Sequence, residues 1–102
     1  METRWEAMEA LFKPKAVAVI GASDNPGKLG SHVMRSLIEG KYQGKIFPVN
    51  PGKEEILEIK AYPSLLQIPE SVDLSIIVLP AESVPKTFQE CKEKGVKGIV
   101  LI

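Results

Sequence analysis

A short polar loop between an apolar run and a helical pattern holds the residues best suited to chemistry. The apolar run covers residues 16–20, and the loop after it contains Gly21, Ser23, Gly27 and Lys28. In a strand–loop–helix unit of this kind, the loop amides and the first amides of the helix point at whatever lies above the strand end. The lysine adds a full positive charge at the same place. The pattern therefore predicts a site for a nucleotide-type diphosphate.

The spacing within this loop differs from two common phosphate-binding motifs. A P-loop has four residues between its first glycine and the Gly-Lys pair, followed by a magnesium-binding hydroxyl. Here five residues separate Gly21 from Gly27, and an apolar residue takes the hydroxyl position. A dinucleotide fingerprint has a second glycine close behind the first and an acidic residue ending the second strand, whereas Ala22-Ser23 and Asn50 stand at these places. Nucleoside triphosphate hydrolysis is therefore disfavoured, while NAD(P) binding stays open as an alternative.

A second lysine follows the second apolar run of the chain. Lys53 stands in the turn-rich stretch 50–53, where dinucleotide-binding proteins carry a carboxylate near the adenosine ribose. A lysine at this place suits a ribose that bears an extra phosphate. NADP and coenzyme A both carry one, on the 2′ and 3′ hydroxyl respectively, so the spacing leaves both ligands open.

Other reactive residue types stand at positions that favour structural roles. His32 falls outside the apolar arc of its helix, so we expect it on the surface, and Cys91 lies on an apolar helix face and is expected to be buried. The acidic residues Asp24, Glu54 and Glu55 have no second acid or base at a catalytic spacing. We therefore predict no catalytic residue and no metal site.

Composition indicates a small globular protein of a reducing compartment. The chain has 102 residues, 44% of them hydrophobic and 25% charged, and a formal net charge of zero. These values suit one domain and give no electrostatic footprint for nucleic acid or an anionic membrane surface. A single cysteine excludes an intrachain disulfide, no apolar run approaches the roughly 20 residues of a membrane helix, and the acidic start is unlike a signal peptide. We expect a cytoplasmic protein, and the preference for Lys and Glu among the charges hints at a thermophilic source.

The elements that must position the polar residues alternate between strands and helices. Hydrophobic periodicity predicts strands near 15–20, 46–49, 59–61, 73–79 and 98–102, and helices over 4–12, 29–39, 64–67 and 82–94. The first strand is apolar throughout, which is typical of a central parallel strand covered on both faces. Pro48 cannot donate to a sheet ladder and favours a peripheral second strand, while Gly30 allows its helix to approach the sheet closely. The order predicts an α/β fold: a Rossmann-like, doubly wound, mostly parallel five-stranded sheet of order 3-2-1-4-5.

Several ordered motifs carry a resemblance to a known family. They occupy residues 12–23, 26–30, 48–51, 61–65, 78–81 and 94–98. In this order they resemble the N-terminal CoA-binding domain of NDP-forming acyl-CoA synthetases, the group that includes the α subunit of ADP-forming acetate–CoA ligase. The CoA-binding domain of the succinyl-CoA synthetase α subunit looks like a more distant relative. The resemblance covers about residues 10–102.

The resemblance implies that coenzyme A is the ligand, and it assigns contacts. Ser23 and the backbone of residues 27–30 would hold the diphosphate, and Lys53 would meet a CoA phosphate. Residues that follow the fourth strand would line the adenine and pantetheine side. The full set expected at the site is Gly21, Ala22, Ser23, Pro26, Gly27, Lys28, Leu29, Gly30, Asn50, Pro51, Lys53, Pro80, Ala81 and Val84.

The resemblance also implies a role within a larger enzyme. In the family, a phosphohistidine of a later domain relays phosphate, and this chain has no matching position. We therefore expect residues 1–102 to be a single CoA-binding domain, an N-terminal fragment of a longer ADP-forming acid–CoA ligase. It would act with further ligase domains or a β subunit and would not catalyse alone; the apolar end at residues 98–102 supports this interpretation. The alternatives are a stand-alone CoA-binding carrier or regulator and, less favoured, an NAD(P)-binding protein.

Overall fold

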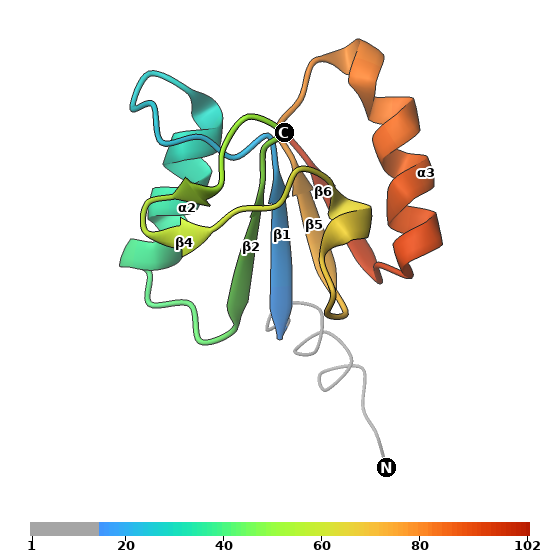
Figure 1. Ribbon diagram of the computed structural model, residues 1–102, viewed down its shortest axis with the longest axis horizontal. Coiled ribbons are helices and arrows are strands. Elements are labelled where there is room, and N and C mark those ends of the chain that lie inside the picture. Colours follow the sequence, from blue (N-terminus) through green and yellow to red (C-terminus); the bar gives the residue numbers. More distant parts are fainter. Residues whose placement is uncertain (1–14) are drawn as a thin grey trace.

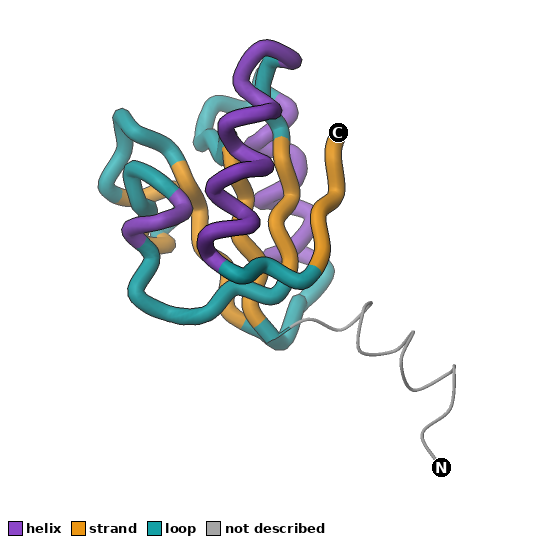
Figure 2. The backbone as a smooth tube through the Cα atoms, turned by 90° about the vertical axis from the view of Figure 1, so that its right-hand side faces the viewer, coloured by secondary structure: helices purple, strands orange, loops and turns teal. Residues whose placement is uncertain are grey.

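The architecture is a parallel β-sheet with helices on both faces. The computed structural model describes residues 15–102, so the predicted helix over 4–12 lies outside the described residues. The elements are β1 (Ala16–Ile20), α2 (Leu29–Glu39), β2 (Lys45–Val49), β3 (Glu55–Ile56), β4 (Ile59–Lys60), the 3-10 turn η1 (Leu65–Gln67), β5 (Leu74–Ile77), the 3-10 turn η2 (Ala81–Ser83), α3 (Val84–Lys94) and β6 (Gly98–Leu101). Figure 1 shows α2 and α3 on opposite sides of the sheet, and Figure 2 looks onto α3 with the sheet behind it.

The sheet has the order β2-β1-β5-β6, and all neighbouring strands are parallel. This confirms the predicted fold class and the predicted order of four strands. β1 is central and buried along its whole length, as its apolar sequence predicts. Pro48 lies in β2, which is an edge strand of the sheet, so the missing amide of the proline costs little pairing.

The predicted third strand differs from the expectation of a five-stranded sheet. β4 pairs antiparallel with β3 in a separate hairpin, and the chain after it touches the main sheet through a single parallel bridge between Val49 and Tyr62. Leu57 and Glu58, which join β3 to β4, have positive φ angles of 50° and 69°. Two such residues make the tight turn that closes a hairpin, so the segment pairs with itself and only Tyr62, after β4, pairs with β2.

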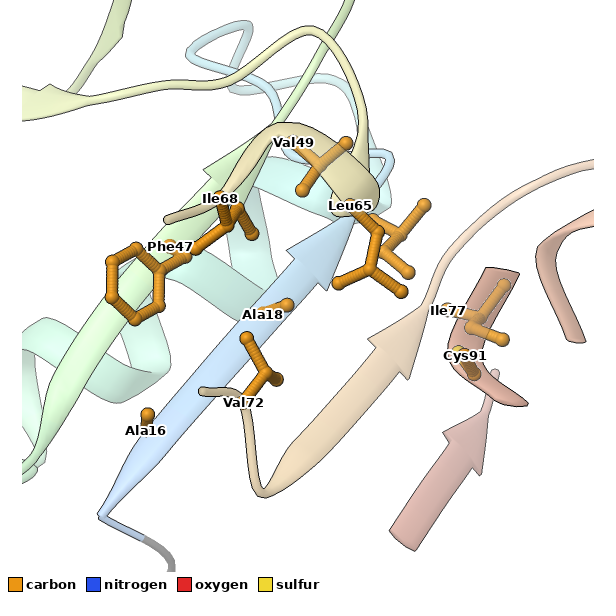
Figure 3. Packing of buried hydrophobic residues seen from close by; sticks show 10 residues of the cluster. Ala16, Ala18, Phe47, Val49, Leu65, Ile68, Val72, Ile77 and Cys91 are labelled. Carbon is orange, nitrogen blue, oxygen red and sulfur yellow. The ribbon is translucent and has the colours of Figure 1, made fainter. Parts of the chain in front are cut away.

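Alternate residues of β1 serve two separate hydrophobic clusters, one on each face of the sheet. Val17 and Val19 pack with Met34 of α2 and Ile56 of β3. The opposite face, drawn in Figure 3, joins β1 to η1 and α3 through residues that include Ala18, Leu65, Ile68, Ile77 and Cys91. The clusters fix both helices against the sheet and hold the carboxyl ends of β1 and β5 side by side.

One residue, Asp73, connects three strands at the amino end of the sheet. The Asp73 side chain accepts hydrogen bonds from the amides of Lys15 and Ala16, with Oδ2 at 2.9 and 3.0 Å. Its backbone carbonyl accepts from the amides of Lys97 and Gly98, each at 3.0 Å. Asp73 therefore joins the starts of β1, β5 and β6 at the end of the sheet opposite the predicted site.

Neither described helix, α2 nor α3, has the length and apolar character needed to cross a membrane.

Candidate ligand-binding site

Two glycines let the β1–α2 loop lie directly on the carboxyl ends of the strands. Gly21 has a φ of +96°, and a methyl group on it would lie 2.1 Å from the Val78 carbonyl oxygen. A methyl group on Gly30 would lie 2.0 Å from the Gly21 carbonyl oxygen. Both positions exclude a side chain, so the start of α2 packs on the end of β1 as the sequence predicted.

The polar residues of the loop hold its shape by bonding to one another. The Asn25 amide donates to Ser23 Oγ at 3.0 Å, and the Gly27 amide donates to Asn25 Oδ1 at 2.9 Å. The Lys28 amide donates to the Asn25 carbonyl at 2.9 Å. Ser23 Oγ is an acceptor in this network, so its own hydroxyl hydrogen is left to donate to a ligand.

The start of α2 has the features of an anion site. Lys28 takes the N-cap position with an extended backbone, and neither a side-chain cap nor an acidic residue in the first turn is present in this part of the described chain. The first amides of the helix, those of Leu29 and Gly30, have no partner within the helix because no earlier turn exists. These amides carry the positive end of the helix dipole, and the exposed Lys28 side chain adds its charge.

The loop borders an open cleft of about 460 Å³ at the carboxyl end of the sheet. It brings together most of the residues predicted for the site. Its lining consists of Gly21, Ala22, Ser23, Lys28, Leu29, Gly30, Asn50, Val78, Leu79, Pro80 and Ile102. Sequence reasoning missed Val78, Leu79 and Ile102, although the rule that ligands bind at the carboxyl ends of parallel strands could have indicated them.

A second cleft of about 850 Å³ holds two further predicted residues, Pro51 and Lys53. Its other lining residues come from the same loop, from β3 and β4, and from the chain after β4; they are Gly52, Glu54, Glu55, Lys60, Ala61 and Pro63. The cleft is open and carries charges of both signs.

Asn50 connects the two clefts. Its Nδ2 donates to the Ala22 carbonyl at 2.9 Å, and its Oδ1 accepts from the Gly52 amide at 2.8 Å. One side chain thus bonds to the β1–α2 loop on one side and to the loop after β2 on the other. A second link is an ion pair in which Lys53 Nζ lies 3.5 Å from Asp24 Oδ2.

Four predicted residues do not line either cleft. Pro26 and Gly27 are exposed at the tip of the β1–α2 loop, and Ala81 is exposed in η2. Val84 begins α3 and packs against the hydrophobic cluster of that face. The two clefts therefore bring together the other ten residues predicted for the site.

The other reactive residue types, histidine and cysteine, lie outside the two clefts. His32 is exposed on α2, and Cys91 is buried on α3, as the sequence predicted. Burial raises the pKa of the Cys91 thiol, which disfavours the thiolate. Within residues 15–102, no group of three metal-ligating side chains comes together.

Comparison with known proteins identifies relatives along almost the whole chain. A family model described as a CoA binding domain matches residues 15–102. The chain is 52% identical over 100 residues to acetate–CoA ligase [ADP-forming] I subunit alpha of Pyrococcus furiosus, aligned with 94% of this chain and 22% of the relative. It is 51% identical over 92 residues to acetate–CoA ligase [ADP-forming] II of Archaeoglobus fulgidus, aligned with 90% of this chain and 14% of that protein.

A solved structure agrees with these sequence relatives. The apo form of dinucleotide forming acetyl-coenzyme A synthetase 1 from Ca. Korarchaeum cryptofilum superposes with a TM-score of 0.86 and 38% identity, over 90% of this chain and 20% of that one. The chain therefore spans only about a seventh to a fifth of the length of these relatives.

Proposed function

The chain belongs to the family of CoA-binding domains, and we propose that its β1–α2 loop holds the diphosphate of coenzyme A. The observation that carries this proposal is the uncapped start of α2 beside the exposed Lys28. The hydroxyl of Ser23 and the backbone of residues 27–30 would complete the contacts. A diphosphate is the part of coenzyme A that such a set of amides and one cation binds best.

The ends of the ligand would extend in two directions from this point. The ribose phosphate of coenzyme A would lie toward Lys53 in the second cleft, past Asn50 and Pro51. The adenine and pantetheine side would follow the residues after β5, namely Pro80, Ala81 and Val84. Val78, Leu79 and Ile102 offer apolar surface beside that path.

The domain would serve within an ADP-forming acid–CoA ligase, where acyl-CoA, ADP and phosphate interconvert with acid, coenzyme A and ATP. The high identity to acetate–CoA ligases supports this role. The domain would hold coenzyme A while another domain or a β subunit transfers the phosphoryl group, so none of its own residues would be catalytic. A cytoplasmic location, expected from the composition, goes with this role. The alternative of a stand-alone carrier or regulator would show in the gene as a reading frame without further ligase domains.

Calorimetric titration of the 102-residue chain with coenzyme A, dephospho-CoA, NAD and NADP tests the ligand. Coenzyme A should bind most tightly, and dephospho-CoA should bind more weakly because it lacks the phosphate proposed to meet Lys53. Tighter binding of NAD than of coenzyme A would overturn the proposal. Equal binding of coenzyme A and dephospho-CoA would remove Lys53 from it.

A further inference from the structure

The ion pair between the two loops involves an acid that the proposed function leaves unused. Asp24 Oδ2 lies 3.5 Å from Lys53 Nζ, and the two side chains are 42% and 49% exposed. An ion pair with this much solvent around it is weak. A ligand phosphate that brings more charge than one carboxylate can therefore replace Asp24 as the partner of Lys53.

The surrounding hydrogen bonds hold Asp24 close to its partner. Asp24 stands between Ser23 and Asn25, and both neighbours are fixed in the turn network of the loop. On the other side, the Lys53 amide donates to the Asn50 carbonyl at 3.3 Å, and the Asn50 side chain bonds to both loops. Because both backbones are held, the Asp24 carboxylate remains near Lys53 even when a ligand is bound there.

We propose that the Asp24 carboxylate and the ribose phosphate of coenzyme A compete for Lys53; this inference rests on the proposed function. Without ligand, the carboxylate neutralises the lysine. When coenzyme A binds, its phosphate displaces the carboxylate and then lies beside a negative charge that cannot move far. Asp24 thus lowers the affinity for coenzyme A and favours its release, while a ligand without the ribose phosphate leaves the pair intact.

The test compares Asp24→Asn with the native chain by calorimetry, using coenzyme A and dephospho-CoA. The variant should bind coenzyme A about two- to fivefold more tightly, the range expected for an exposed ion pair. Its affinity for dephospho-CoA should equal that of the native chain. Because both ligands carry the same diphosphate, any general change in the loop would alter both affinities together. Only the ribose phosphate distinguishes them.

Two controls separate the ion pair from general charge effects. Glu54→Gln removes an acid that borders the same cleft but has no ion pair with Lys53 among the described residues, so it should raise the affinity for coenzyme A less than Asp24→Asn does. A Lys53→Met background removes the cation for which Asp24 and the phosphate compete, so there Asp24→Asn should give a smaller gain than in the native chain.

Three results would overturn the competition by Asp24 and leave the proposed function standing. These are an unchanged or weaker affinity of Asp24→Asn for coenzyme A, an equal gain for both ligands, and an equal gain from Glu54→Gln. A native chain that binds no coenzyme A would overturn the proposed function itself.

Discussion

The two ends of the parallel sheet use their backbone amides in opposite ways. At the amino end, one carboxylate, that of Asp73, accepts from the amides of Lys15 and Ala16. At the carboxyl end, the first amides of α2 have no side-chain cap, and Lys28 has no acidic partner among residues 15–102. Groups of the same chemistry stabilise the fold where the chain pairs them, and they are available to a ligand where the chain leaves them open.

Gly21→Ala would disrupt the packing at the carboxyl end of the sheet and should have the largest effect on the free energy of unfolding. The positive φ and the 2.1 Å approach to the Val78 carbonyl leave no room for a methyl group, so the free energy of unfolding should fall by more than about 3 kcal/mol. Denaturation in urea measures this loss. Gly27→Ala is the matched control, because its nearest neighbour, Asn25 Oδ1, would be 3.4 Å away; equal losses in both variants would contradict the explanation.

Asp73→Ala would remove hydrogen bonds at the amino end of the sheet and leave the candidate site unchanged. Two amides would lose a charged acceptor, which should lower the free energy of unfolding by about 2–3 kcal/mol. The affinity of the folded protein for coenzyme A should stay the same. Glu70→Ala serves as control, since its exposed ion pair with Lys45 should contribute at most about 1 kcal/mol. If Asp73→Ala weakened binding in the folded protein, the two ends would not be independent.

Lys28→Ala would separate binding from stability at the carboxyl end. Loss of a charge-assisted contact should weaken coenzyme A binding by about 1.5–3 kcal/mol, with the free energy of unfolding within about 0.5 kcal/mol of the native value. Calorimetry and urea denaturation measure the two quantities. Lys86→Ala removes an exposed lysine of α3 and should change neither. A loss of stability without a loss of affinity would show that Lys28 is a structural residue.

The smallest expected effect at the amino end is the contribution of Tyr42 to the pH dependence of stability. Burial, and after it the negative charge of Asp73, raises the pKa of Tyr42 above its ordinary value of about 10. The folded chain then keeps the phenol proton at a pH where the unfolded chain has lost it, so the free energy of unfolding should fall as the pH rises above about 10. Tyr42→Phe should make this decline less steep in urea denaturation measured from pH 8 to 11. Identical slopes in the two proteins would contradict the shift.

Local patterns were enough to predict much of the fold. Helix α2 has the predicted bounds, 29–39, because its apolar arc and terminal glycine lie within one short segment. The hairpin of β3 and β4 was not foreseen, since its turn at Leu57 and Glu58 uses positive φ angles without the glycine or asparagine that usually indicates them.

The same limit applies to the candidate site. The loop pattern indicated Lys28, and the family resemblance implied Ser23; both residues line one cleft. The lining residue Ile102 and the pairing of Asp24 with Lys53 bring together segments that are distant in sequence. Such contacts depend on strand order and loop placement, which no local pattern contains.

The two bonds of the Asn50 side chain have a consequence for how ligands are selected. By joining the Ala22 carbonyl to the Gly52 amide, Asn50 restrains the separation between the β1–α2 loop and the loop that carries Lys53. Under the proposed function, a ligand would have to match this separation with the distance between its diphosphate and its ribose phosphate. Such a ligand would bind without the entropic cost of ordering either loop.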